Sequence, residues 1–262
     1  MAPERAPPGS RASPSRGAKR ARRSLTDGAV EIIRDRILDL TLAPGTRIDD
    51  RFLMERFGTG RTPAREAFNR LAAEGLIIIQ RNRGAFVRPL DIAQLRPFFD
   101  AYAASERLVG FFCRTGEAGL VEALRGIERD YEAALAGSDL LEVTRMNAAF
   151  HGRLAAATGN EYVHEFATRL YNHARRLSYL TYLSGEGRDD LRRMGQRIVS
   201  DHEEVICAIA SGDNGALVEI LTRHAAFFHE RIIRTVGVVR GFDAPLPAGS
   251  KVVSQPRDAA AG

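Results

Sequence analysis

The stretch Arg61-Thr62-Pro63-Ala64-Arg65-Glu66-Ala67-Phe68-Asn69-Arg70-Leu71 decides the fold of the N-terminal part of this protein. It predicts a helix, because Thr62 is a good N-cap and Pro63 is a good first helical residue. Apolar side chains at three- and four-residue spacing form one stripe, namely Ala64, Phe68, Leu71 and Ala72. Arg61, Arg65 and Asn69 repeat every four residues on another face, where they could contact base edges in a DNA major groove. An ordinary solvated face is the alternative, so the neighbouring segments have to decide.

Two segments before this helix predict the rest of a helix-turn-helix. Residues 25–40 form an amphipathic stripe, and Pro44-Gly45 ends the segment with a turn. Residues 52–57 predict a short second helix that Gly58 closes. Two short helices joined by a tight turn with glycine form a helix-turn-helix, in which the helix over 61–71 would be the recognition helix.

A β-hairpin is predicted directly after the recognition helix. Leu76-Ile77-Ile78-Ile79 is too short and too β-branched for a helix, and Ala85-Phe86-Val87 pairs back with it. The connecting turn carries Arg81, Arg83 and Gly84, a compact basic tip that could enter a minor groove. These elements in this order predict a winged helix-turn-helix over residues 25–90, which would bind double-stranded DNA.

The remainder of the chain predicts an antiparallel bundle of about six helices, which makes the fold mostly α. Apolar spacing of three and four recurs in residues 91–114, 117–136, 139–158, 160–183, 188–211 and 213–236. Short glycine-bearing breaks separate these segments, so consecutive helices should be antiparallel neighbours. Pro97 must either start the first helix or kink it. We expect residues 91–238 to form this second domain and residues 239–262 to be a flexible tail.

Charge and cysteine content restrict the location and the partners of the protein. Residues 1–24 contribute +6 to the net charge of +5 and are rich in Pro, Ser, Gly and Ala, which predicts a disordered basic arm. The arm could add salt-sensitive affinity for phosphates or be only a solubilising leader.

Cys113 and Cys207 show no metal-ligand spacing, so we expect buried thiols in a reducing compartment. No apolar run has transmembrane length, and no secretory signal is evident. We therefore expect a cytoplasmic protein without a membrane partner.

The N-terminal motifs resemble those of the GntR family of bacterial transcription regulators. They are Leu42-Ala43-Pro44-Gly45, Arg61-Thr62-Pro63-Ala64-Arg65-Glu66-Ala67, Leu71-Ala72-Ala73-Glu74-Gly75-Leu76 and Arg83-Gly84-Ala85. The resemblance implies that Arg61, Arg65 and, on a looser local match, Arg51 contact operator DNA. Gly60 stands where a serine is usual, which removes one potential phosphate contact. The full predicted DNA-binding set is Arg51, Arg61, Thr62, Arg65, Asn69, Arg81, Arg83 and Gly84.

A candidate metal site is formed by four residues of the bundle. Asn147 and His151 lie four apart, hence on one face of one helix, while His202 and His224 lie on later helices. Imidazole suits zinc, nickel, copper or iron, and an amide oxygen is a weaker ligand. The set could therefore hold a divalent ion, although each histidine could equally be an ordinary core or surface residue.

The same part of the chain is similar to the FCD domain of the FadR subfamily of GntR regulators. The shared motifs are Met146-Asn147-Ala148-Ala149-Phe150-His151, Gly159-Asn160, Asp201-His202-Glu203-Glu204, Gly212-Asp213 and Arg223-His224. Many FCD domains bind a metal through an Asp, a His four residues later and two further histidines, and these roles fall on Asn147, His151, His202 and His224. Asn147 replaces the usual Asp and removes a negative charge. The metal would therefore bind more weakly, or the three histidines would suffice to hold it.

The resemblance also implies an acidic effector, although its usual anchor is missing. Family members often carry an Arg three residues before the glutamate of the first bundle helix, and counting back from Glu106 gives Ala103. Arg107, Arg175 and Arg176 could substitute, with a solvated role as the alternative for each. The expected protein is a homodimeric repressor released from its operator by a small organic or sugar acid bound near a divalent metal such as zinc or nickel.

Two other functions compete with this interpretation. One is a metal-dependent helical enzyme fused to a DNA-binding domain, and the other is an architectural DNA-binding protein that senses nothing. His202-Glu203-Glu204-Val205-Ile206 starts like a zincin motif, but Ile206 occupies the place of the second histidine. No nucleophile elbow, P-loop or dinucleotide fingerprint is present. We therefore predict that the protein is not an enzyme.

Overall fold

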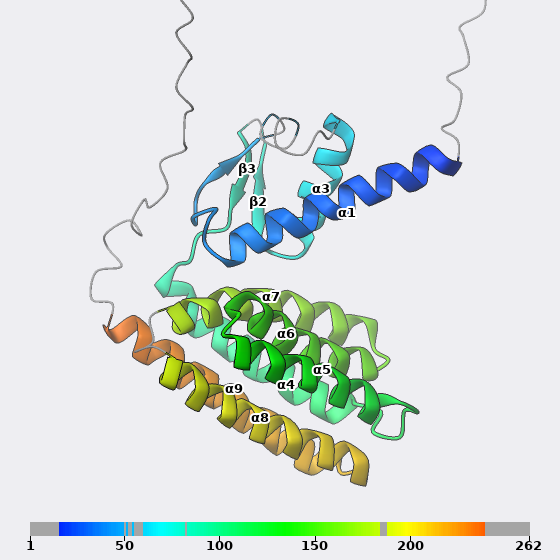
Figure 1. Ribbon diagram of the computed structural model, residues 1–262, viewed down its shortest axis with the longest axis vertical. Coiled ribbons are helices and arrows are strands. Elements are labelled where there is room, and N and C mark those ends of the chain that lie inside the picture. Colours follow the sequence, from blue (N-terminus) through cyan, green and yellow to red (C-terminus); the bar gives the residue numbers. More distant parts are fainter. Residues whose placement is uncertain are drawn as a thin grey trace, which may run out of the picture.

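The computed structural model describes residues 16–49, 51, 54, 60–81, 83–183 and 188–238. These residues form a smaller winged-helix domain and a larger helical bundle. In Figure 1 the winged-helix domain lies above the bundle. The predicted fold class, mostly α with a small wing and a C-terminal bundle, is confirmed.

The winged-helix domain packs two helices against a small sheet. Helix α1 spans Arg16–Leu38 and α3 spans Arg61–Ala73, while the antiparallel sheet has the order β1 (Arg47–Ile48), β3 (Gly84–Val87), β2 (Ile77–Gln80). The core between them is apolar, with Val30, Ile33, Ile37, Ala64, Phe68, Leu71, Leu76 and Ile77 all buried. The Arg34 guanidinium donates two hydrogen bonds to Glu74, at 2.9 and 2.7 Å, and Arg70 pairs with Asp27. The recognition helix is therefore held to α1 by both packing and ion pairs.

Two local predictions for this domain need correction. Helix α3 begins at Arg61 with Gly60 as N-cap and no side-chain cap bond, so Thr62 is not the cap. Pro63 still lies in the first turn, where its missing N–H has no helical partner to lose. Helix α1 begins at Arg16 rather than at residue 25, so residues 16–24 are helical where we expected a disordered arm.

The wing is part of a three-stranded sheet rather than a lone hairpin. Strand β1 was not predicted because two residues are too few to show an alternating pattern. Most of the predicted second helix (residues 52, 53 and 55–57) and Gly58 lie outside the described residues, as do the outer arm (1–15) and the tail (239–262). Arg51 and Met54 are described, and both are helical.

The bundle contains the six predicted helices with nearly the expected bounds. They are α4 (Leu95–Phe112), α5 (Leu120–Gly137), α6 (Leu140–Ala157), α7 (Glu161–Leu183), α8 (Arg188–Ser211) and α9 (Asn214–Val238). A short 3-10 turn, η1 (Ile92–Gln94), precedes α4, and Pro97 lies in the first turn of α4, so it starts the helix without a kink. In Figure 1, α7 lies toward the winged-helix domain, and α8 and α9 lie on the far side.

Helix α7 provides the main contact between the two domains. The Asn172 amide of α7 donates to the Glu74 carbonyl at 3.4 Å. Next to this contact, and within the winged-helix domain, the Arg88 Nε donates to the Gly75 carbonyl at 2.7 Å. Gly75 has φ +77°, and a Cβ placed on it would lie 3.4 Å from the His173 ring nitrogen Nε2. Glycine therefore suits this position because it permits both the left-handed backbone and the close approach of α7.

Two general expectations about the chain meet different outcomes. Among the described residues, no helix combines the length and the apolar character needed to cross a membrane. Cys113 is buried as expected, but Cys207 is exposed, which corrects the prediction of two buried thiols. Its neighbours Ile206 and Ala208 turn inward, so the helical turn leaves Cys207 on the outer face of α8 despite its apolar surroundings in sequence.

Candidate DNA-binding surface and metal centre

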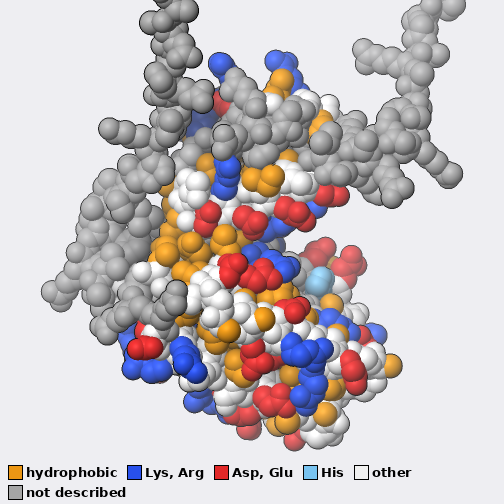
Figure 2. Space-filling model, viewed as in Figure 1, with side chains coloured by type: hydrophobic (Ala, Val, Ile, Leu, Met, Phe, Trp, Pro, Cys, Tyr) orange, Lys and Arg blue, Asp and Glu red, His pale blue; other side chains and the backbone are white. Residues whose placement is uncertain are grey.

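Helix α3 presents a polar face to solvent. Ala64, Ala67, Phe68 and Leu71 are buried, which fixes the helix against the small core. The predicted contact residues Arg61, Thr62, Arg65 and Asn69 are all exposed on the remaining surface. Basic side chains project from the end of this domain that lies farthest from the bundle (Figure 2). The geometry suits a helix that enters a major groove.

The wing adds a second basic group. Arg81, Arg83 and Gly84 are exposed at the tip of the β2–β3 turn, and Arg51, which precedes α3 in the chain, is exposed too. Strand β1 brings a further arginine that sequence reasoning missed, since the Nε of Arg47 lies 3.4 Å from where a Cβ on Gly84 would be. Arg47 could not be found from the sequence, because its place beside the wing depends on the β1–β3 pairing.

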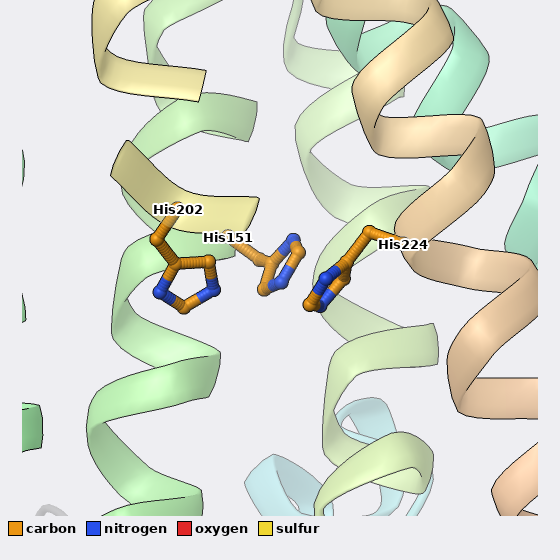
Figure 3. A group of neighbouring side chains, drawn as sticks. All are labelled: His151, His202 and His224. Carbon is orange, nitrogen blue, oxygen red and sulfur yellow. The ribbon is translucent and has the colours of Figure 1, made fainter. Parts of the chain in front are cut away.

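Three histidines from three helices meet inside the bundle. His151 on α6, His202 on α8 and His224 on α9 turn their rings toward a common space (Figure 3). Their ring centroids are 5.2 to 5.6 Å apart, and one ring nitrogen from each lies within 4.8 Å of the others. All three are buried, with exposed fractions of 1, 1 and 5 %. The predicted histidines are thus brought together in ligand geometry.

A carboxylate holds each of the three rings from behind. The Nδ1 atoms of His151, His202 and His224 lie 3.2, 2.6 and 3.1 Å from carboxylate oxygens of Glu106, Glu128 and Asp201 respectively. The Nε2 atoms of His151 and His202 are buried without a hydrogen-bond partner among the described residues. A carboxylate at Nδ1 orients an imidazole and raises its basicity, so Nε2 is the nitrogen left to bind a cation.

These three carboxylates were not identified from the sequence. In the sequence, Glu106 was used only to locate the position of the missing arginine. Asp201 was noted only as part of an FCD motif, and neither was predicted to contact a histidine. Glu128 gave no signal, since it lies 74 positions from His202. Their partnership with the histidines depends on which helices become neighbours in the bundle.

The electrostatics favour neutral imidazoles at His202 and His224. Burial lowers the pKa of His202 well below its usual value, and the neighbouring histidines lower it further. Burial also lowers the pKa of His224, although its hydrogen bond to Asp201 opposes the shift. Burial raises the pKa of the Glu128 carboxyl to about 8. Neutral imidazole is the form that binds a metal, so these shifts of His202 and His224 suit metal binding.

Asn147 completes the predicted ligand set at the edge of the cluster. Its Oδ1 is buried without a hydrogen-bond partner among the described residues, and its side chain lines two small cavities that adjoin His151 and His224. Three imidazoles with a possible amide oxygen suit zinc or nickel better than a hard cation such as magnesium. The donors present therefore fit a divalent transition metal.

The three candidate effector arginines lie in different places. Arg107 is exposed on α4 and lines a surface groove between α4 and α9. None of the three clustered histidines lines this groove. Arg175 and Arg176 are buried, with exposed fractions of 8 and 0 %, so the solvated alternative is wrong for this pair. Arg175 lines the cavity beside His151, whereas Arg176 lines neither cavity that adjoins the histidines. Burial lowers the pKa of both guanidiniums to about 10.

A fourth arginine, missed in the sequence, borders the histidine cluster. Arg231 lies seven residues after His224 on α9 and shares a cavity with it and Asn147. Its exposed fraction is 8 %, it donates to the Thr181 hydroxyl at 2.6 Å, and its guanidinium lies 5.0 Å from the Tyr182 ring centroid. The seven-residue spacing could have suggested a shared helix face with His224.

Comparison with known families assigns both domains. Residues 25–87 match the model of the bacterial regulatory proteins of the gntR family, and residues 92–227 match the FCD domain. The chain belongs to the GntR family. Its C-terminal FCD domain is the one found in regulators of the FadR type.

Relatives of this GntR regulator are themselves transcription factors. It is 25% identical to the Nta operon transcriptional regulator of Aminobacter aminovorans over 70% of this chain and 93% of that protein. It is 26% identical to the HTH-type transcriptional repressor GlaR of Escherichia coli K12 over 69% and 83%. A putative GntR regulator from Rhodococcus sp. RHA1 shares the fold, with a TM-score of 0.63 at 22% identity over 83% of this chain and 100% of that one.

Membership of the GntR family states what the two domains do in general. The chain is a DNA-binding transcription regulator, whose winged-helix domain binds DNA and whose FCD domain is the effector-binding part. Metal binding is common among FCD domains, and the three buried histidines lie together in this one. The relatives are regulators rather than enzymes.

Proposed function

We propose that this GntR regulator is a repressor that leaves its operator when a small organic or sugar acid binds beside a divalent metal in the FCD domain. The observation that carries the proposal is the histidine cluster, with buried Nε2 atoms on His151 and His202 that have no partner in the described part of the chain. Burying unpaired polar atoms is costly, so a cluster of this kind needs a reason. A bound cation supplies one.

The proposed metal ligands are His151, His202 and His224, with Asn147 as a weaker fourth ligand through Oδ1. Because asparagine is neutral, the cation keeps one more unit of positive charge than it would with aspartate. That charge supports recognition of an acid, since a bound metal attracts and polarises a carboxylate. Zinc and nickel are the metals that the donor set favours.

Two arginines support an acidic effector at the same site. Arg175 and Arg231 each border a cavity that adjoins the histidines, and the Nε of each is buried without a partner among the described residues. No carboxylate is within salt-bridge distance of either guanidinium in that part of the chain. Asp35 and Glu74 act on Arg175 without forming a salt bridge to it. A buried guanidinium that lacks an ion pair favours an anion nearby. In many family members an arginine of the first bundle helix binds the acidic effector, and Arg231 is our candidate for that role here. Arg107 and Arg176 are weaker candidates.

The size of the cavities suggests how an effector could act at a distance. The two cavities measure about 20 and 10 Å³, which is room for a water molecule but not for an organic acid. An acid can therefore enter only if the lining moves, and α7 and α9 are among the helices that form this lining. Because α7 also contacts the winged-helix domain through Asn172, such a movement would shift the DNA-binding helix.

We propose that the regulator acts as a homodimer on a palindromic operator in the cytoplasm. Residues 25–90 would bind DNA, and residues 91–238 would bind the effector and dimerise. The exposed face of α4 supports a two-fold contact, because Asp100 and Arg107 lie symmetrically about the small pair Ala103-Ala104. Two antiparallel copies of α4 would pair each Asp100 with the partner's Arg107. Phe111, 68 % exposed, would be covered by the same contact.

We propose that the recognition helix and the wing divide the DNA contacts between them. Arg61, Arg65 and Asn69 would contact base edges, Thr62 and Arg51 the phosphate backbone, and Arg81, Arg83 and Gly84 the minor groove. The basic residues before residue 25 would add affinity without specificity, so this part of the binding should weaken as salt rises.

The test is operator binding by the full chain, measured by fluorescence anisotropy with the DNA upstream of its own gene. Zinc or nickel is added or removed with a chelator, and a panel of small organic and sugar acids is titrated. We expect at least one acid to weaken operator binding only when metal is present, and His202→Ala to abolish that response while keeping basal DNA affinity.

Three results would oppose the proposal. Full metal stoichiometry in His202→Ala would reject the histidine site. The absence of any acid response in the metal-loaded protein would favour an architectural DNA-binding protein. Metal-dependent turnover of an acid would revive the enzyme alternative.

A further inference from the structure

A groove of about 880 Å³ separates the winged-helix domain from the bundle. One wall is formed by the end of the sheet and the interdomain linker, with Gly75, Ile78 and Arg88–Leu90. The other wall is formed by α4 and α7, with Phe98 and His173 among its residues. Hydrophobic side chains are visible between the two domains in Figure 2. We call this space the junction groove.

The junction groove is mostly apolar. Its aliphatic and aromatic lining comes from both domains and includes Ile78, Pro89, Phe98, Phe166, Leu170 and Leu177. Tyr162 and Phe166 at its rim are 84 and 40 % exposed. A concave apolar space of several hundred Å³ with a few polar groups is the usual form of a small-molecule site.

Positive charge gathers at one side of the junction groove. Arg88 and Arg169 line it, and Arg176 lies one helical turn beyond His173 on α7. Arg176 is fully buried, and none of its three guanidinium nitrogens has a hydrogen-bond partner among the described residues. Burial, followed by Arg176, Arg88 and Arg169, lowers the pKa of His173 to about 4, so the ring is neutral at physiological pH.

The acidic residues of the junction groove do not cancel this charge at His173. Asp91 and Glu165 also line the space, but neither forms a salt bridge with Arg88 or Arg169 within the described ranges. Neither is among the causes of the shift at His173, which are burial and the three guanidiniums. The groove therefore combines an apolar floor, a lining with two arginines and two acidic residues, and positive charge concentrated beside His173, where the buried Arg176 adds to Arg88 and Arg169.

We propose that the junction groove binds a small amphipathic acid, with its apolar body against Phe98 and Leu170 and its anionic group toward Arg88, Arg169 and the neutral His173 ring. Apolar burial would supply most of the affinity, and the guanidiniums would select an anion over a neutral analogue. This site is distinct from the histidine cluster, because the two share no lining residue.

Occupancy of the junction groove would change DNA binding directly. Its two walls belong to different domains. Arg88, in the segment that links the domains, lines the groove, and so do Gly75 and His173, where α7 comes close to the winged-helix domain. A ligand that holds these walls at a fixed separation binds one arrangement of the domains better than others. It therefore shifts the equilibrium between DNA-competent and incompetent arrangements by its difference in affinity for them.

The experiment uses the full chain and the fluorescent probe 1-anilinonaphthalene-8-sulfonate, which combines an aromatic body with one anionic group. Sodium decanoate competes for the probe site, and 1-decanol is the neutral counterpart. We expect saturable probe binding that decanoate displaces better than decanol. Arg169→Glu, an exposed substitution, should weaken probe binding roughly tenfold, as expected for loss of a charge-assisted contact. Ala101→Phe should fill the groove and block binding.

The matched control is Arg192→Glu, the same charge reversal at an exposed position on α8 outside the groove. It should bind the probe as wild type does, and circular dichroism verifies the fold of each variant. Operator binding should respond to decanoate in wild type but not in Arg169→Glu.

Unchanged probe affinity in Arg169→Glu would overturn the inference, as would equal displacement by decanol. Self-association that Arg169→Glu abolishes, without saturable probe binding, would also overturn it and assign the groove to a second copy of the chain. The test of the junction groove can be told apart from the test of the metal site. Probe binding should persist in chelator and in His202→Ala, so failure of either site leaves the other intact.

Discussion

Gly110→Ala should destabilise the bundle at the contact that positions the histidine cluster. A Cβ on Gly110 would lie 3.0 Å from the Cα and 3.1 Å from the backbone nitrogen of Val218. Backbone atoms cannot move aside as a flexible side chain can, so α9 would have to shift away from α4. Overpacking of this kind costs about 1–3 kcal/mol, while replacing glycine by alanine in a helix returns about 1 kcal/mol. We expect a net loss of up to about 2 kcal/mol in the free energy of unfolding.

The same shift should weaken metal binding, because Gly110 lies one turn from Glu106, which orients His151, and Val218 precedes His224 on α9. The assay is guanidinium unfolding followed by circular dichroism at 222 nm, with chelator and with zinc. Gly152→Ala in α6 is the matched control, because a Cβ there meets nothing within 4 Å. It should stabilise the helix by up to about 1 kcal/mol. If Gly110→Ala proved as stable as Gly152→Ala, the close α4–α9 packing would be refuted.

Three further predictions concern other parts of the molecule. Arg65→Ala should weaken operator binding by about 1–3 kcal/mol and relax base preference, whereas Arg192→Ala should leave it unchanged; equal affinities would reject the recognition role. Asp100→Arg or Arg107→Asp alone should weaken the dimer about tenfold and the double variant should restore it, as measured by analytical ultracentrifugation, unless α4 lies outside the dimer contact. Because burial and then Arg176, Arg88 and Arg169 lower the pKa of His173 from 6.5 to about 4, the unfolded chain binds a proton that the folded chain does not between those values. Stability should therefore fall as pH falls from 7 to 5, by about 1–2 kcal/mol more in wild type than in His173→Gln; parallel pH profiles would contradict the shift.

Much of the fold was predictable because it depends on local patterns. Helical periodicity and glycine breaks located α4 to α9 within a few residues, and β-branched runs located β2 and β3. The pattern failed where the signal was short or depended on a distant partner. The two residues of β1 form a strand only because β3 pairs with them, and α1 extends to Arg16 through a segment whose composition predicted disorder.

The site was predictable in part, and the limit has a clear physical cause. His151, His202 and His224 could be proposed because their motifs are local, but the carboxylates behind them could not. Glu128 lies on α5, and only the packing of α5 against α8 brings it to His202. Arg176 was predicted to bind the effector or to be solvated, and nothing in the sequence indicated that it is fully buried in the folded chain.

By itself the sequence determined the class of fold and the recognition helix, since both depend on residue types at helical spacing. It pointed to the three histidines through local motifs that resemble those of the FCD domain. Only the tertiary structure decided which charges are buried, which carboxylates hold the imidazoles, and that a groove lies between the domains. These features depend on contacts between segments far apart in the chain. The strength of an ionic or metal contact is set by burial and distance, which residue spacing along one helix does not specify.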